Sequence, residues 1–193
     1  DLLRPENWSF SEPCTFSQFD PCLEELPNTT MTIEGTLTLS PDGKLLNIMR
    51  FGKYHHALSY EVNVLDHDAP LMFSHCIRFP ANYSKFMIQY DPVSCRYYSI
   101  GTMAYDPERT STRDYLALLV SRDLEHWEIA CDLHDYRGID TAHIGFQYVD
   151  FLFDGEDLIY LCRTALNGAH NFHDANYSVF SRIHDFRKML PAD

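Results

Sequence analysis

The chain has 193 residues, of which 45% are hydrophobic and 14% aromatic, and its formal net charge is −13. A chain of this length and composition can bury one sizeable core, which excludes an intrinsically disordered protein. The acidic charge argues against binding to nucleic acid or to an anionic membrane surface, and no stretch approaches the roughly 20 apolar residues of a membrane-spanning helix.

Little regular structure is predicted for residues 1–31. They begin at Asp1 and not at a methionine, which we interpret as a processed or shortened product, and the start of the chain lacks the pattern of a signal peptide. The segment also contains Pro5, Pro13, Pro21 and Pro27. We therefore interpret it as a lead into the fold with at most one strand.

The following residues predict a four-stranded antiparallel meander. Alternating or apolar runs at 33–39, 44–51, 57–65 and 71–79 have the pattern of strands. The sequence Ser40-Pro41-Asp42-Gly43 between the first two runs is typical of a tight turn.

The same order of strands then recurs twice. Strands are predicted at 85–90, 95–102, 114–121 and 127–133, and again at 146–153, 158–164 and 177–183. A four-stranded unit repeating at intervals of roughly 50 to 60 residues is the signature of β-propeller blades. We predict an all-β fold in which one domain, 32–193, holds three four-stranded antiparallel blades at about 32–80, 81–135 and 143–188.

Three blades predict an incomplete wheel. Propellers close with about 4–8 blades, and each blade needs a neighbour on both faces. We expect the open faces to be covered by missing N-terminal blades or by self-association. The 193-residue chain alone is therefore predicted not to form a stable closed monomer.

The six cysteines predict no metal site, because they form no CxxC pair and no Cys/His spacing typical of zinc. Four of them lie in or beside apolar runs. We interpret them as buried free thiols, which favours a reducing compartment such as the cytoplasm.

Several short segments resemble known propeller enzymes. Glu34, the Asp-Gly turn and Arg50 are similar to one hairpin of sialidases, and 121–127 resembles the S-x-D-L-x-x-W turn of propeller glycosidases that act on furanosides. Residues 145–150 and 167–176 resemble sialidase-like proteins of bacterial glycan users. The chain thus resembles the C-terminal part of a five- or six-bladed, sialidase-like glycoside hydrolase.

The resemblance implies a site at one end of the central channel. It would be lined by the starts of inner strands (Glu34, Lys85, Gln147), the ends of second strands (Arg50, Arg163) and the loops between the second and third strands (His170, His173, Asp174). A sialidase uses three arginines around a carboxylate, and the sequence places two of them.

Three residues are the catalytic candidates, because glycoside cleavage needs an acid and a base or nucleophile. Glu34 could be a general base for a tyrosine nucleophile, or a solvated strand carboxylate. Asp150 could be the acid, or paired within the wheel because a buried carboxylate needs a partner. His170 could be an acid or base, or belong to a hydrogen-bonded loop.

The remaining candidates would bind substrate. Arg50 and Arg163 could clamp a carboxylate, or form ion pairs between blades. The other predicted contacts are Lys85, Gln147, His173 and Asp174. The loop residues His170, His173 and Asp174 could instead hold a metal, but this alternative is the weaker one. We predict neither a metal nor a cofactor.

Tyr148 has the only aromatic hydroxyl beside a channel-facing segment and could be a nucleophile, but strand alternation turns it into the core between blades. Ser121, Asp123 and Trp127 are predicted to be structural. Asp123 should accept backbone N–H bonds in its turn, and Trp127 should pack between blades.

The sequence as a whole predicts part of a sialidase-like glycoside hydrolase that cleaves a terminal sugar from glycans. The alternatives are a carbohydrate-binding propeller without catalysis and a scaffold for protein partners. The polar residues at the predicted channel mouth favour the first two.

Overall fold

The computed structural model describes residues 1–14, 32–51, 55–81, 83–109 and 111–190. The predicted segment 15–31 lies outside the described residues. Within them, no helix is long or apolar enough to cross a membrane. The helices of this described part are two short 3-10 turns, η1 (Pro5–Asn7) and η3 (Phe186–Met189).

Three antiparallel sheets follow one another along the chain. The first blade consists of β1 (Thr32–Leu39), β2 (Leu45–Phe51), β3 (His56–Glu61) and β4 (Met72–Arg78). The second consists of β5 (Met87–Asp91), β6 (Arg96–Thr102), β7 (Tyr115–Ser121) and β8 (Trp127–Asp135). The third blade consists of β9 (Gly145–Asp154), β10 (Asp157–Ala165) and β11 (Tyr177–Ile183), with three strands among the described residues.

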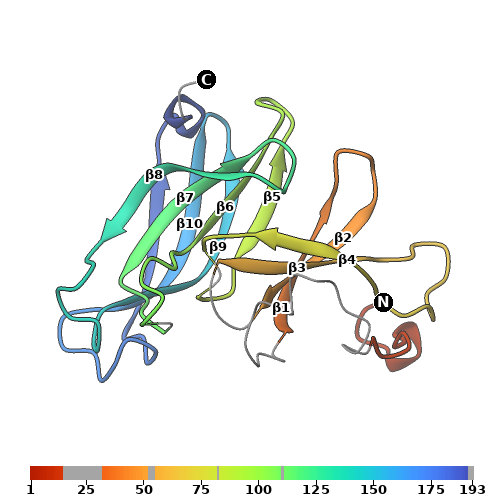
Figure 1. The fold of residues 1–193 in the computed structure, drawn as a ribbon, viewed down its shortest axis with the longest axis horizontal. Coiled ribbons are helices and arrows are strands. Elements are labelled where there is room, and N and C mark those ends of the chain that lie inside the picture. Colours follow the sequence, from red (N-terminus) through yellow and green to blue (C-terminus); the bar gives the residue numbers. More distant parts are fainter. Residues whose placement is uncertain (15–31, 52–54, 82, 110, 191–193) are drawn as a thin grey trace.

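The all-β prediction and its strand order are confirmed, and every predicted strand is present within a few residues of its predicted bounds. The largest difference is at the end of β3, which stops at Glu61 because the Asn63 side chain accepts the N–H groups of Leu65 and Asp66 and turns the chain there. In Figure 1 the first blade lies at the right and the other two at the left.

The cores lie between the blades. One cluster joins Leu46, Ile48 and Ile77 of the first blade to second-blade residues such as Tyr115 and Leu119. A second cluster joins the second blade to the third. The predicted position of Trp127 is confirmed, since its ring packs on the first of these clusters and lies edge-to-face on Phe79 at 5.1 Å.

The burial of strands depends on how many neighbours a blade has. In the second blade, which lies between the other two, β7 is buried at every position. In the third blade, burial alternates, and Leu152, Leu161 and Phe180 are exposed on the side away from the second blade. This open face agrees with an incomplete wheel, while self-association stays a prediction.

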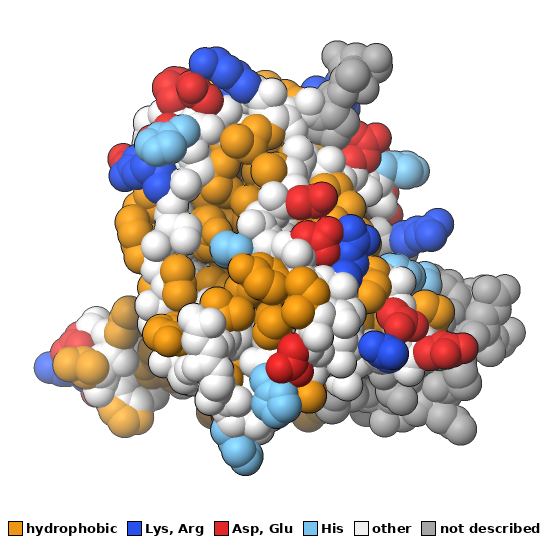
Figure 2. Space-filling model, turned by 90° about the vertical axis from the view of Figure 1, so that its left-hand side faces the viewer, with side chains coloured by type: hydrophobic (Ala, Val, Ile, Leu, Met, Phe, Trp, Pro, Cys, Tyr) orange, Lys and Arg blue, Asp and Glu red, His pale blue; other side chains and the backbone are white. Residues whose placement is uncertain are grey.

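Apolar side chains also gather at the centre of the face that lies at the left of Figure 1, as the space-filling view shows (Figure 2). A propeller blade that lacks a neighbour presents this kind of surface, because both of its faces have the composition of a packing face.

The free-thiol prediction is wrong for Cys76, which is disulfide-bonded, and Cys95 is exposed, not buried. Cys14, Cys131 and Cys162 are free. Because a disulfide is a feature of oxidising compartments, the cysteines no longer favour the cytoplasm.

The prediction for Asp123 is confirmed. Its carboxylate accepts the backbone N–H groups of Glu125 and His126 at 2.9 and 2.8 Å. Burial raises the pKa of Asp123, but these hydrogen bonds and the one from His126 outweigh it and lower the pKa to about 2.

An ion pair ties the end of the chain to the second blade. Arg187, in η3, donates to both oxygens of Asp91 at 2.7 and 2.9 Å, and Asp91 is only 1% exposed. Burial raises the pKa of Asp91, but the hydrogen bonds from Arg187 and Ser94 lower it to about 2. Because the folded pKa lies below its ordinary 3.8, this stabilisation is present above pH 3.8 and is lost as the pH falls toward 2.

Replacing the arginine of this pair should destabilise the protein strongly. Arg187→Met leaves the Asp91 carboxylate buried without its partner, which costs on the order of 3–5 kcal/mol. Urea unfolding at pH 7 measures the change, and the loss should shrink as the pH approaches 2.

Arg182 provides a matched control. It pairs with Asp154 and Asp157 but is 36% exposed, so Arg182→Met should cost less than about 1 kcal/mol. Equal losses in the two variants would contradict a special role for the buried pair.

Candidate active site

Two bulges of the same kind interrupt the first strands of the first and third blades. In β1, Ile33 pairs with Arg50 and Gly35 with Met49, so Glu34 is an extra residue. In β9, Gln147 pairs with Arg163 and Asp150 with Leu161, so two residues oppose one. Glu34 and Tyr148 both have a left-handed backbone, with φ of 57° and 54°.

The bulges correct the alignment of the repeats by one residue. Because Ile33 and Gln147 pair with the arginines near the ends of the second strands, Arg50 and Arg163, the structural counterpart of Glu34 is Tyr148 and not Gln147. The prediction that Tyr148 faces the core is wrong, since its ring lies against two guanidinium groups. A bulge takes a residue out of the alternation on which that prediction depended.

Three arginines and Tyr148 come together around these bulges. The Arg163 guanidinium carbon lies 5.1 Å from the centre of the Tyr148 ring, and that of Arg113 lies 5.6 Å from it. Arg50 is close enough for its charge to lower the pKa of Arg113. Arg50 also donates to Glu34 at 2.9 Å and to the carbonyl of Tyr83 at 2.9 Å.

Arg113 is the most unusual member of this group. It is 7% exposed, and its Nε and Nη1 atoms have no hydrogen-bond partner among the described residues. Burial lowers the pKa of Arg113 and the charge of Arg50 lowers it further, while Tyr148 and Glu34 act in the opposite direction. A buried cation with unpaired N–H groups is suited to bind an anion.

The neighbouring acid does not neutralise this charge. Asp114 is fully buried, but its carboxylate accepts the Tyr105 hydroxyl at 2.9 and 2.8 Å and the Gly138 N–H at 3.0 Å. These bonds anchor the start of β7, and Asp114 forms no ion pair with Arg113 among the described residues.

Sequence reasoning missed Arg113, although a signal was present. It lies in the loop between the second and third strands of its blade, the position that led to His170 and His173 in the third blade. Applying the same rule to the second blade would have found it.

The predicted loop residues form one network on the β10–β11 loop. Asp174 accepts from Asn171 at 2.8 Å and pairs with His170 at 3.0 Å and His173 at 3.4 Å. Hydrogen bonds from His170, Asn171 and His173 lower the pKa of Asp174 to about 2. No cluster of three metal-ligating side chains is found within the described ranges.

Gln147 and Lys85 are connected to this group through the backbone. Gln147 pairs with Arg163 across the β9–β10 hairpin, and Lys85 is next to a residue that bonds to Tyr148. Gln147 is fully buried, and its amide donates to the carbonyls of Phe172 and His173 at 3.1 and 2.7 Å. Lys85 is half-buried and follows Ser84, whose hydroxyl accepts the N–H of Tyr148 at 2.9 Å.

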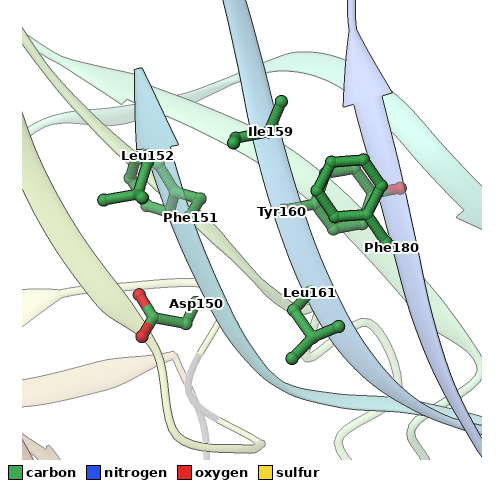
Figure 3. Close-up of a pocket in the computed structure, with 7 residues that line it drawn as sticks. All are labelled: Asp150, Phe151, Leu152, Ile159, Tyr160, Leu161 and Phe180. Atoms are coloured by element: carbon green, nitrogen blue, oxygen red, sulfur yellow. The ribbon is translucent and has the colours of Figure 1, made fainter. Parts of the chain in front are cut away.

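Asp150 lies in a different environment. It lines a shallow groove on the open face of the third blade together with Leu152, Leu161 and Phe180 (Figure 3). Its surroundings are mostly apolar, its side chain is exposed, and the groove is lined by none of the arginines among the described residues. Its predicted role as the acid stays a prediction.

No family model and no curated protein matches this sequence. Two solved structures are similar, an α-L-arabinofuranosidase from Fusarium graminearum with an iminosugar inhibitor and an α-L-arabinanase from Penicillium chrysogenum with arabinobiose, at 11% and 13% identity and a TM-score of 0.53 each. The chain has the fold of a β-propeller. Each match covers 80% of this propeller chain and 46% of the other, so the chain spans less than half the length of these enzymes.

The buried charge predicts a variant that gains stability. Arg113→Met keeps a similar side-chain length. It removes a cation whose environment disfavours the charged form, together with two guanidinium nitrogens that have no hydrogen-bond partner among the described residues. The free energy of unfolding should rise by about 1–3 kcal/mol, as measured by urea denaturation.

Arg187→Met is the comparison, since it removes a paired arginine and should lose stability. If Arg113→Met lost as much stability as Arg187→Met, Arg113 would be a structural cation and the anion site would be contradicted.

Proposed function

We propose that this chain is part of a glycoside hydrolase that removes a terminal, carboxylate-bearing sugar of the sialic acid type from glycans. The observation that carries the proposal is the group formed by Tyr148 and three arginines, Arg50, Arg113 and Arg163. Guanidinium groups bind carboxylates through paired hydrogen bonds, and a neutral sugar needs no such group.

Tyr148 and Glu34 support cleavage as well as binding. Glycosidases of the sialidase type use a tyrosine nucleophile. In the proposed reaction the Tyr148 oxygen attacks the anomeric carbon as the glycosidic bond breaks, Glu34 takes the phenolic proton, and water then hydrolyses the sugar–tyrosine bond. His170, on the loop between β10 and β11, is the candidate acid for the leaving oxygen.

The runner-up is a propeller that binds acidic sugars without cleaving them. The same arginines would serve it, and only Tyr148 and Glu34 argue for the enzyme. A neutral furanoside substrate, as in the arabinan-acting proteins of similar fold, is disfavoured because it brings no negative charge to the buried Arg113 guanidinium.

An assay of the full-length protein tests the proposal. On a panel of aryl glycosides, the sialoside should be hydrolysed and the arabinofuranoside and galactoside should not. Tyr148→Phe should lower kcat by at least roughly a hundredfold, because the nucleophile is lost. Arg163→Ala should act mainly on KM, because it contacts the ground-state carboxylate.

Arg182→Ala is the control for a lost surface charge and should leave both constants unchanged. Binding of the sialoside without turnover would favour the runner-up, and turnover of the arabinofuranoside alone would contradict the acidic-sugar proposal.

A further inference from the structure

The β10–β11 loop, residues 166–176, places the ring of Phe172 over the guanidinium of Arg113. The guanidinium carbon of Arg113 lies 5.8 Å from the centre of the Phe172 ring and 5.6 Å from that of Tyr148. The cation therefore contacts two rings, and together with the surrounding chain they leave it 7% exposed. Contact with aromatic faces stabilises such a cation but satisfies none of its N–H groups.

The position of Phe172 is fixed by its backbone. Its N–H donates to the carbonyl of Ala142 at 2.7 Å, and its own carbonyl accepts from Gln147 at 3.1 Å. The next carbonyl, that of His173, accepts from Gln147 at 2.7 Å and from Arg163 at 3.3 Å. Residues of the proposed site thus hold the loop that covers it.

Close packing beneath the loop leaves it little room to shift. A Cβ on Gly145 would lie 2.3 Å from the carbonyl oxygen of Phe172, so only glycine fits there. Gly145 also forms a bridge with Arg113. The loop, the start of β9 and the arginine are therefore held as one unit.

We propose that Phe172 is a specificity-determining residue that makes this site select a carboxylated sugar over its uncharged analogue. By excluding water from the Arg113 guanidinium, the ring strengthens the attraction between that cation and a bound anion. It acts through Arg113 and is a positioning residue. The inference rests on the proposed function, because it assumes that the ligand is an acidic sugar.

The test compares two probes that differ by one charge, methyl α-glycoside of N-acetylneuraminic acid and its methyl ester, titrated into the full-length protein by calorimetry. The unaltered protein should bind the acid more tightly. Phe172→Ala should lower the ratio of acid affinity to ester affinity by about tenfold, because water then reaches Arg113, while affinity for the ester changes less than about twofold.

Two further variants keep the inference testable. Phe172→Leu retains an apolar cover and should keep most of the ratio, whereas Phe172→Gln brings a polar group to the cation and should lower the ratio even if Phe172→Ala does not fold. Phe180→Ala removes an exposed ring from the open face of the same blade and should leave the ratio unchanged.

The proposed function and the role of Phe172 predict different outcomes in this test. A ratio of one in the unaltered protein would remove the proposed function and this inference with it. A high ratio that neither Phe172→Ala nor Phe172→Gln reduces would overturn the inference alone.

Discussion

The burial of the Arg113 guanidinium is the constraint on which the site depends. A cation placed between two rings and beside another arginine costs free energy, and two of its nitrogen atoms find no hydrogen-bond partner in the described part of the chain. The cores between blades and the buried pair of Arg187 and Asp91 supply stability elsewhere. A stable fold can tolerate an unfavourable buried charge of this kind. An anion that binds beside the charge then compensates it.

The same backbone bulge occurs in two blades of this repeating fold and carries a different residue in each. The bulges in β1 and β9 hold the backbone of one residue in the left-handed region, and the partner strand carries an arginine near its end in both blades. The first blade fills the bulge with Glu34 and the third with Tyr148. The same geometry thus presents a carboxyl group and a phenol at equivalent places in the two blades.

The strands, the turns and the structural roles of Asp123 and Trp127 could be predicted, because alternation and turn chemistry act over a few neighbouring residues. The place of Tyr148 could not, since a bulge depends on how two strands pair and reverses the face by a single residue. The position of Arg113 in the loop between β6 and β7 could have been predicted by the rule applied to the third blade, but its burial could not, because it depends on Phe172, far along the chain. The bonded state of Cys76 likewise depends on tertiary contacts that spacing alone does not reveal.

The central claim is that Arg50, Arg113 and Arg163 together bind a carboxylate. A crystal structure of the full-length protein with methyl α-glycoside of N-acetylneuraminic acid tests it most directly. The account predicts the carboxylate oxygens within about 2.7–3.1 Å of guanidinium nitrogens of all three arginines, with the unpaired N–H groups of Arg113 satisfied. A sugar bound with its carboxylate in solvent, or with Arg113 still unpaired, would contradict the account.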